Sequence, residues 1–176
     1  MRMTPFVRKL ALIAHIVSSI GWIGAVAVYI ALAVAILIRQ DVSFVRGAYF
    51  AMELAVWFVI VPLSLASFLT GLILSLGTVW GLFRHYWVIF KLFLNVFAVV
   101  VLLMYTESIG SFADIAARDP LSNAELSALR DPTHLIHSGG ALFVLLVATI
   151  LAVYKPRGMT QYGRRKQFAE RKPLVP

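Results

Sequence analysis

Histidines and one lysine inside apolar segments are the side chains of this sequence best suited to ligand or proton chemistry. His15 stands within a long apolar run and Lys91 within a later one, and counting residues from the ends of the runs predicts a similar depth for the two. An ionisable side chain in such a segment is a candidate functional residue, because its desolvation must be offset by a partner. Neutral imidazole binds haem iron and carries protons. His15 is equally compatible with a neutral histidine that hydrogen-bonds a serine or a backbone carbonyl of another helix.

A first set of residues predicts a cofactor site. Trp22 follows His15 at a spacing of seven, and Asn95 follows Lys91 at a spacing of four, so each pair shares a helical face. Lys91 can pair with an acidic group, such as a haem propionate, a quinone or a lipid headgroup, or its long stem can carry the ammonium to the membrane surface. The predicted cofactor-binding residues are His15, Trp22, His85, Lys91 and Asn95.

A second set predicts a metal site, away from the first, where the last apolar run begins. His134 and His137 open an apolar run at a spacing of three, and Met52 and Met104 are expected at a similar depth. Imidazole with thioether suits copper, whereas imidazole with a nearby carboxylate suits zinc or other divalent ions. Histidines that hydrate and cap the start of a helix are the alternative interpretation. Catalytic residues stay unknown, because no nucleotide-binding loop, zinc-protease helix or catalytic triad occurs in the sequence.

The composition predicts the medium in which these residues lie. Hydrophobic residues make up 61% of the 176 residues and charged residues 14%, and the chain has no cysteine. A water-soluble domain of this size carries more charge, so an integral membrane protein in contact with the lipid bilayer is expected. The net charge of +8 flanks the apolar runs, which argues against a nucleic-acid partner.

Four apolar runs are long enough to be transmembrane helices. They cover about 10–38, 54–82, 86–106 and 133–154, and a basic tail follows at 155–176. The predicted fold is therefore an all-α integral membrane four-helix bundle in one domain. Pro62 is expected to kink the second run, and Ser122 or Asn123 to cap a short helix over 124–129.

Charge asymmetry predicts the orientation. Twelve of the sixteen Lys and Arg residues fall at the N-terminus, at Arg84 and Lys91 around the turn between the second and third runs, and in the tail. By the positive-inside rule both termini are cytoplasmic, in a multi-pass protein of the plasma membrane. The tail either fixes this topology or recruits anionic lipid headgroups or a partner. Small residues such as Ser67, Gly71 and Ser75 indicate close helix packing, with a homo-oligomer as an alternative.

Three stretches resemble a family of uncharacterised bacterial four-helix integral membrane proteins. They are HIVSSIGWIGAVAVYIALAV from His15, WFVIVPLSLASFLTGLILSLGTVWGLFRHYWVIFKL from Trp57, and HSGGALFVLLVATILAVYKPRGMTQYGRRKQ from His137. Together they cover most of the chain. The resemblance implies the membrane bundle and no established activity.

A more distant similarity is to the CopD copper-resistance membrane domain and the HemJ-type protoporphyrinogen oxidase. It rests on His15 followed by Trp22 and Gly24, and on Lys91 within a later apolar run. The similarity to the oxidase implies haem b contact and porphyrin chemistry at these positions. This chain has Met104 and its neighbours where a further histidine is expected at the end of the third run.

Three functions follow from these patterns as hypotheses. The first is a small haem-b-binding or redox-associated membrane protein, with His15 as ligand and Lys91 pairing with an acidic group of the cofactor. The second is a protein of copper or other metal homeostasis or transport. The third is a non-catalytic accessory membrane subunit with no cofactor. Whether the protein is an enzyme stays open.

Overall fold

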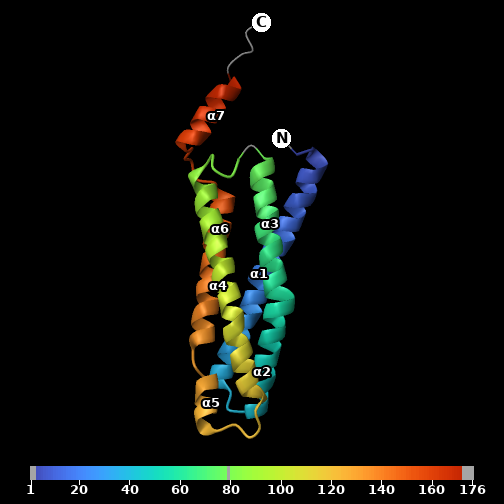
Figure 1. Cartoon of the computed structure of the whole chain (residues 1–176), viewed down its shortest axis with the longest axis vertical. Coiled ribbons are helices and arrows are strands. Elements are labelled where there is room, and N and C mark those ends of the chain that lie inside the picture. Colours follow the sequence, from blue (N-terminus) through green and yellow to red (C-terminus); the bar gives the residue numbers. More distant parts are fainter. Residues whose placement is uncertain (1–2, 79, 172–176) are drawn as a thin grey trace.

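The computed structural model of the chain describes residues 3–78 and 80–171, and it is all-α (Figure 1). Its helices are α1 (Pro5–Ile38), α2 (Val42–Ala55), the π-helix η1 (Val56–Ile60), α3 (Val61–Gly77), α4 (Tyr86–Ala117), α5 (Asn123–Leu129), α6 (Thr133–Tyr154) and α7 (Gln161–Arg171). All of these elements except α7 form one elongated bundle, and α7 extends from its end. The prediction of an all-α four-helix bundle is confirmed.

The first span is a single helix of 34 residues. The Thr4 side chain accepts a hydrogen bond from the backbone N–H of Val7, and Pro5 occupies the first turn, where no internal N–H is needed. The helix thus begins before the apolar run predicted at residue 10. It ends at Ile38, where Arg39 takes up extended backbone.

The second span has a π-helical turn just before Pro62. The helix runs from Val42 to Gly77 without interruption, but its central turn, Val56–Ile60, is a π-helix. Proline has no N–H to donate, and its ring would collide with the carbonyl oxygen four residues earlier. A wider turn just before Pro62 accommodates both effects, as π-turns do within longer helices. The helix also begins twelve residues before the run predicted at 54.

The third and fourth spans differ in how far they extend. α4 continues eleven residues beyond the predicted limit of 106, to Ala117. The short helix predicted before the fourth span is present as α5. Ser122 and Glu125 form its reciprocal capping box, in which each side chain bonds the backbone N–H of the other residue. The fourth span, α6, has the predicted limits of 133 and 154.

The four spans pack so that each lies against two or more others. α1 packs mainly against α3 and α6, while α4 packs against α2 and α6. The core contains large apolar side chains from all spans, including the fully buried Trp22, Tyr49, Met52 and Ile109. The start of α1 and the end of α6 lie at the same end of the bundle (Figure 1).

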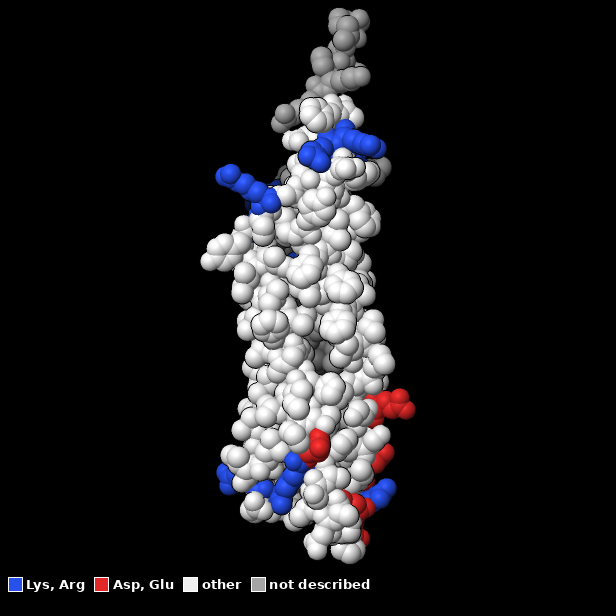
Figure 2. Space-filling model, turned by 90° about the vertical axis from the view of Figure 1, so that its left-hand side faces the viewer, with Lys and Arg blue, Asp and Glu red and all other residues white. Residues whose placement is uncertain are grey.

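The outside of the bundle is apolar along its length. Large hydrophobic side chains such as Phe58, Phe143 and Val153 are at least two-thirds exposed. In the face shown, Asp and Glu lie toward one end, the acidic end, together with some Lys and Arg, whereas the other, basic end carries Lys and Arg alone, and a largely uncharged belt lies between them (Figure 2). Four helices of the described residues are long and apolar enough to cross a bilayer. Such a surface requires lipid, and the protein is an integral membrane protein.

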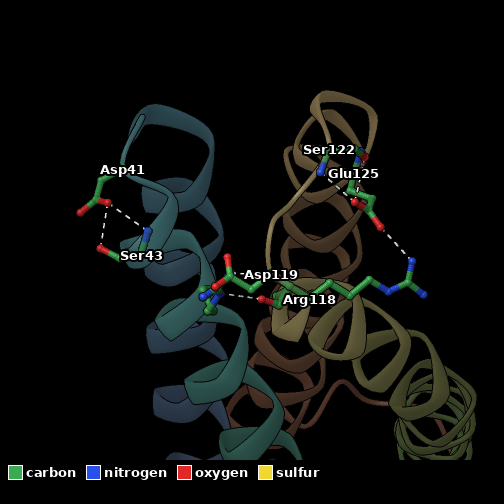
Figure 3. A network of polar contacts seen from close by, with 8 residues as sticks. Asp41, Ser43, Arg118, Asp119, Ser122 and Glu125 are labelled. Carbon is green, nitrogen blue, oxygen red and sulfur yellow. Dashed lines mark hydrogen bonds and ion pairs between the residues drawn. The ribbon is translucent and has the colours of Figure 1, made fainter.

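Polar contacts tie the segments together at the acidic end (Figure 3). Arg46 of α2 donates from Nε to the carbonyl of Ala116 at 2.8 Å and from Nη2 to the carbonyl of Arg118 at 2.7 Å. These two carbonyls belong to the end of α4, where helical partners run out. Arg118 in turn pairs with Glu125 of α5 at 2.8 Å. The connection between α4 and α5 is therefore anchored to α2.

The basic tail contains a helix that contacts the bundle. Before α7, the Thr160 backbone N–H donates to the carbonyl of Arg84 at 2.9 Å, and its hydroxyl donates to the carbonyl of Phe83 at 2.7 Å. Met159 forms an isolated bridge with His85. The tail is thus attached to the segment between the second and third spans, and α7 begins from a fixed point.

Candidate cofactor site

His15 is held by α3 in one defined orientation. Its Nδ1 lies 3.0 Å from the carbonyl oxygen of Ser67 and 3.1 Å from the hydroxyl oxygen of Thr70. A carbonyl oxygen only accepts, so Nδ1 carries the hydrogen and donates it. In the neutral ring Nε2 therefore bears the lone pair. Histidines that bind metals are oriented in this way, with one nitrogen donating to a carbonyl and the other directed at the metal.

Lys91 faces that lone pair from α4. Its Nζ lies 3.5 Å from Nε2 of His15. Within the described part of the chain, Lys91 forms no ion pair with a carboxylate. Asn95, one turn further on, donates from Nδ2 to the backbone carbonyl of Lys91 at 2.8 Å. The spacing-based prediction that Lys91 lies at the depth of His15 thus agrees with the geometry, and the ammonium has room for an anionic partner.

These residues line a cavity of about 540 Å³ at the basic end of the bundle. Arg8, Lys91 and Lys155 contribute three cations to its lining, and no acidic residue does among those that the structure describes. Its volume is within the range usual for small-molecule and cofactor sites. An uncompensated positive lining of this kind favours a ligand with acidic groups.

Two further features of the lining leave space or hydrogen-bonding capacity for a ligand. A Cβ atom added to Gly71 would lie 3.1 Å from Cε1 of His15, so the absence of a side chain there makes room for the imidazole. The indole Nε1 of Trp87 is buried and has no hydrogen-bond partner among the described residues. A buried N–H without an acceptor is costly, and a ligand oxygen in the cavity would satisfy it.

Two predicted cofactor residues lie outside this cavity. Trp22 is buried in the core two turns further along α1 and lines a different cavity. His85 is bonded through Nδ1 to the carbonyl of Trp80 at 2.9 Å, and its ring packs edge-on against the Trp80 ring. The structure thus brings together His15, Lys91 and Asn95 but does not bring Trp22 or His85 to them.

The predicted metal residues cluster in part. His134 is buried among aromatic rings, and the hydroxyl groups of both Tyr29 and Tyr105 contact its Nδ1. His137 stacks on Tyr105 with ring centroids 4.7 Å apart. Met52 is fully buried, whereas the Met104 side chain is 74% exposed on the surface of α4. No group of three or more His, Asp or Glu that could hold a metal occurs in the described residues.

Several residues of both clusters have no signal in the sequence that would single them out. Thr70, Arg8 and Lys155 are common residue types in common positions, and only the packing of α1, α3 and α6 brings them to His15. Tyr29 and Tyr105 lie 76 positions apart, and no local pattern connects them. The spacing of Ser67 and Gly71 predicted close packing, which is how Gly71 accommodates the imidazole.

Comparison with family models, curated proteins and solved structures found no match to the chain. The site is therefore interpreted from its own chemistry. An imidazole with a fixed free nitrogen, three cations and an unpaired indole N–H can hold a flat or acidic cofactor. The same groups can also exchange a proton between Lys91 and His15.

Proposed function

We propose that this integral membrane protein binds haem b and takes part in redox chemistry, and that His15 would hold the iron. The observation that carries the proposal is the hydrogen bond from Nδ1 of His15 to the carbonyl of Ser67. It leaves Nε2, with its lone pair, as the nitrogen that can bind a metal inside the cavity. Haem iron in proteins is commonly held by one histidine in this arrangement.

The rest of the cavity lining fits the same group. Haem b carries two propionates, and Arg8, Lys91 and Lys155 supply the positive charge to pair with them. Trp87 offers its buried Nε1 as a further donor. Because the Lys91 ammonium lies 3.5 Å from Nε2, its long stem must turn away when His15 binds a metal. A bound haem would supply one-electron chemistry, and the protein would set its potential through the ligand and the surrounding charge.

The absorption spectrum of the full chain, extracted from membranes in detergent, tests the proposal. We expect a Soret band that shifts on addition of dithionite, and its loss in His15→Ala. His85→Ala is the matched control, since His85 lies outside the cavity and should leave the spectrum unchanged. A protein that stays colourless after growth with added haem, or a His15→Ala variant with the full band, would contradict haem binding.

We further propose that both termini are cytoplasmic and that the protein is a plasma-membrane protein. The same-side placement of the start of α1 and the end of α6, and the gathering of Lys and Arg there, support this orientation (Figures 1 and 2). Reporter fusions at residue 3 and residue 171 should both give the cytoplasmic signal. A periplasmic or extracellular signal from either fusion would refute the orientation.

We also propose that α7 contacts anionic lipid headgroups of the same membrane face. It carries Arg164, Arg165 and Lys166, and its Tyr162 and Phe168 are more than half exposed. Basic residues beside exposed aromatic rings favour the surface of an anionic bilayer. Kinship with the bacterial four-helix family, and distant kinship with the CopD and HemJ proteins, are also proposals, and haem binding would support the similarity to the HemJ-type oxidase.

A further inference from the structure

A second cavity, of about 390 Å³, lies in the half of the bundle away from His15. It is formed by α1, η1, α4 and α6, and residues from Trp22 to Tyr29 of α1 line one of its walls. The first cavity uses His15 of the same helix and Lys91 of α4, so the two cavities follow one another along the bundle axis. None of the residues assigned to the proposed haem site lines the second one.

The lining of the second cavity is almost entirely apolar and carries no charged residue. Trp22, Phe97 and Phe143 supply aromatic surface. Phe97 is 50% exposed and Phe143 is 67% exposed, so the cavity is bordered by side chains that face the lipid. A ligand that reaches this cavity would come through the bilayer, and the absence of cations disfavours a phosphate or carboxylate headgroup.

Polar groups are confined to the end of the cavity near the start of α6. Nδ1 of His137 donates to the carbonyl of Thr133 at 2.8 Å, which leaves Nε2 as a hydrogen-bond acceptor in the neutral ring. Tyr29 and Tyr105 also line the cavity, and both hydroxyls contact the single atom Nδ1 of His134. The two hydroxyls also lie within hydrogen-bonding reach of each other, and Nδ1 bonds fully to only one of them, so the other can give its hydrogen to its neighbour or to a ligand.

We propose that this cavity binds the ring of a membrane-soluble quinone or hydroquinone. The aromatic walls suit a flat, neutral ring, and the polar end suits the oxygen that such a ring carries. A hydroquinone hydroxyl would donate to His137, and a quinone carbonyl would accept from Tyr105. Both partners reach the cavity from helices that stack through these two side chains, whose ring planes are 21° apart. Binding requires no haem and does not depend on the proposed function.

Quenching of tryptophan fluorescence by a short-chain ubiquinone analogue tests the proposal on the full chain in detergent. Trp22 lines the cavity, so bound quinone should quench its emission with a saturable dependence on concentration. Gly140→Leu should weaken binding at least tenfold, because Gly140 lines the cavity and a Cβ there meets open space that the added side chain would fill. Gly139→Leu is the matched control, since its Cβ also meets open space but Gly139 does not line the cavity.

Two single-group variants test the polar end. Tyr105→Phe keeps the ring and removes the hydroxyl, and it should weaken binding of the quinone about three- to tenfold. His137→Leu should weaken hydroquinone binding by a similar factor. His15→Ala should bind quinone as the wild type does, so the loss of haem and the loss of quinone binding can be told apart.

Three results would overturn the proposal. Non-saturable quenching that is equal in the wild type, Gly140→Leu and Gly139→Leu would show partitioning of the quinone into detergent. Displacement of the quinone by a saturated fatty alcohol with equal affinity, together with an unchanged affinity in Tyr105→Phe, would show a non-specific site for acyl chains. Binding that is lost only in His15→Ala would place the quinone in the first cavity.

Discussion

Nδ1 of His15 in α1 donates to the backbone carbonyl of Ser67 in α3, at a distance of 3.0 Å. The acceptor belongs to the main chain, so the packing of the two helices sets the orientation of the imidazole. Replacing the side chain of the acceptor residue would not remove this hydrogen bond. The Thr70 hydroxyl, 3.1 Å away, shares the same hydrogen. Two neighbouring contacts of this pair, with Gly71 and with Lys91, can be varied without touching the bond itself.

Gly71→Ala should disturb His15 without altering any polar group. The added Cβ would lie 3.1 Å from Cε1 of the imidazole, closer than ordinary packing, so the ring must shift by a few tenths of an ångström. We expect a loss of about 1–3 kcal/mol in unfolding free energy and a broadened or shifted Soret band. Differential scanning fluorimetry and absorption spectra measure the two effects. Gly24→Ala is the control, because a Cβ at Gly24 meets nothing within 4 Å.

Lys91→Met should separate stability from ligand binding. The half-buried ammonium has only His15 as a side-chain partner in the described part of the chain, so a thioether of similar length removes a desolvated charge. We expect an unchanged or higher melting temperature and an affinity for haem about three- to tenfold lower, since one charge-assisted bond to a propionate is lost. Haem titration and scanning fluorimetry on the same sample provide the two values. Lower stability with full haem affinity would contradict the role given to Lys91.

Tyr49→Phe tests the attachment of α5. The Tyr49 hydroxyl is fully buried and donates to the carbonyl of Leu129 at 2.6 Å. Without it, that carbonyl is left without this donor, which should cost about 1–3 kcal/mol. The thermal unfolding midpoint in detergent should fall by several degrees. Tyr154→Phe, at a position that is 78% exposed, should leave the midpoint within error of the wild type.

Arg46→Lys tests whether the guanidinium fork matters at the end of α4. Arg46 reaches two carbonyls with two different nitrogens, and an ammonium on a flexible stem cannot occupy both positions at once. We expect a loss of about 1–2 kcal/mol in local stability and faster hydrogen exchange of the backbone amides at 116–119. Arg165→Lys in α7 is the control for the charge-preserving change. Equal exchange rates in wild type and Arg46→Lys would show that the fork contributes nothing.

The start of α2 should respond to acid. The hydroxyl and backbone N–H of Ser43 donate to the Asp41 carboxylate and hold its pKa below the ordinary value. The unfolded chain binds this proton at higher pH than the folded one, so the stabilisation is complete above a pH of about 4 and is lost as pH falls through the lowered pKa. The backbone amides at 43–46 should lose protection against hydrogen exchange as pH falls over that range. Asp41→Asn should remove most of the pH dependence.

The long apolar runs were sufficient to predict the bundle, because lipid requires every backbone polar group to be paired inside a helix. The ends of the helices were harder to predict, since Arg46, Tyr49 and Glu53 were read as a loop although they belong to α2. Polar residues beyond the hydrocarbon core remain helical when a neighbouring span supports them. Here Arg46 is supported by the end of α4, a contact across 70 residues that no local pattern contains.

The approximate depth of a residue along a span could be inferred from the sequence. Whether its side chain faces the core or the lipid could not. Counting residues placed Lys91 beside His15, and the two are in contact. The spacing of seven put Trp22 on the helical face of His15, but Trp22 lies two turns further along α1 and lines the other cavity. Met52 and Met104 were expected at a similar depth, and one is buried while the other is 74% exposed. The order in which the helices surround one another decides which residues at a given depth are buried.

The length of the helices gives the molecule a part that stands in water. At 1.5 Å per residue, the 32 residues of α4 reach about 48 Å, whereas the hydrocarbon layer measures about 30 Å. The surplus at the acidic end, which α2, α5 and the last turns of α4 share, is long enough to extend beyond the hydrocarbon layer. A spectroscopic label attached to this surplus would rise and tilt with the helices themselves, so events in either buried cavity become observable from the aqueous side without any probe entering the membrane.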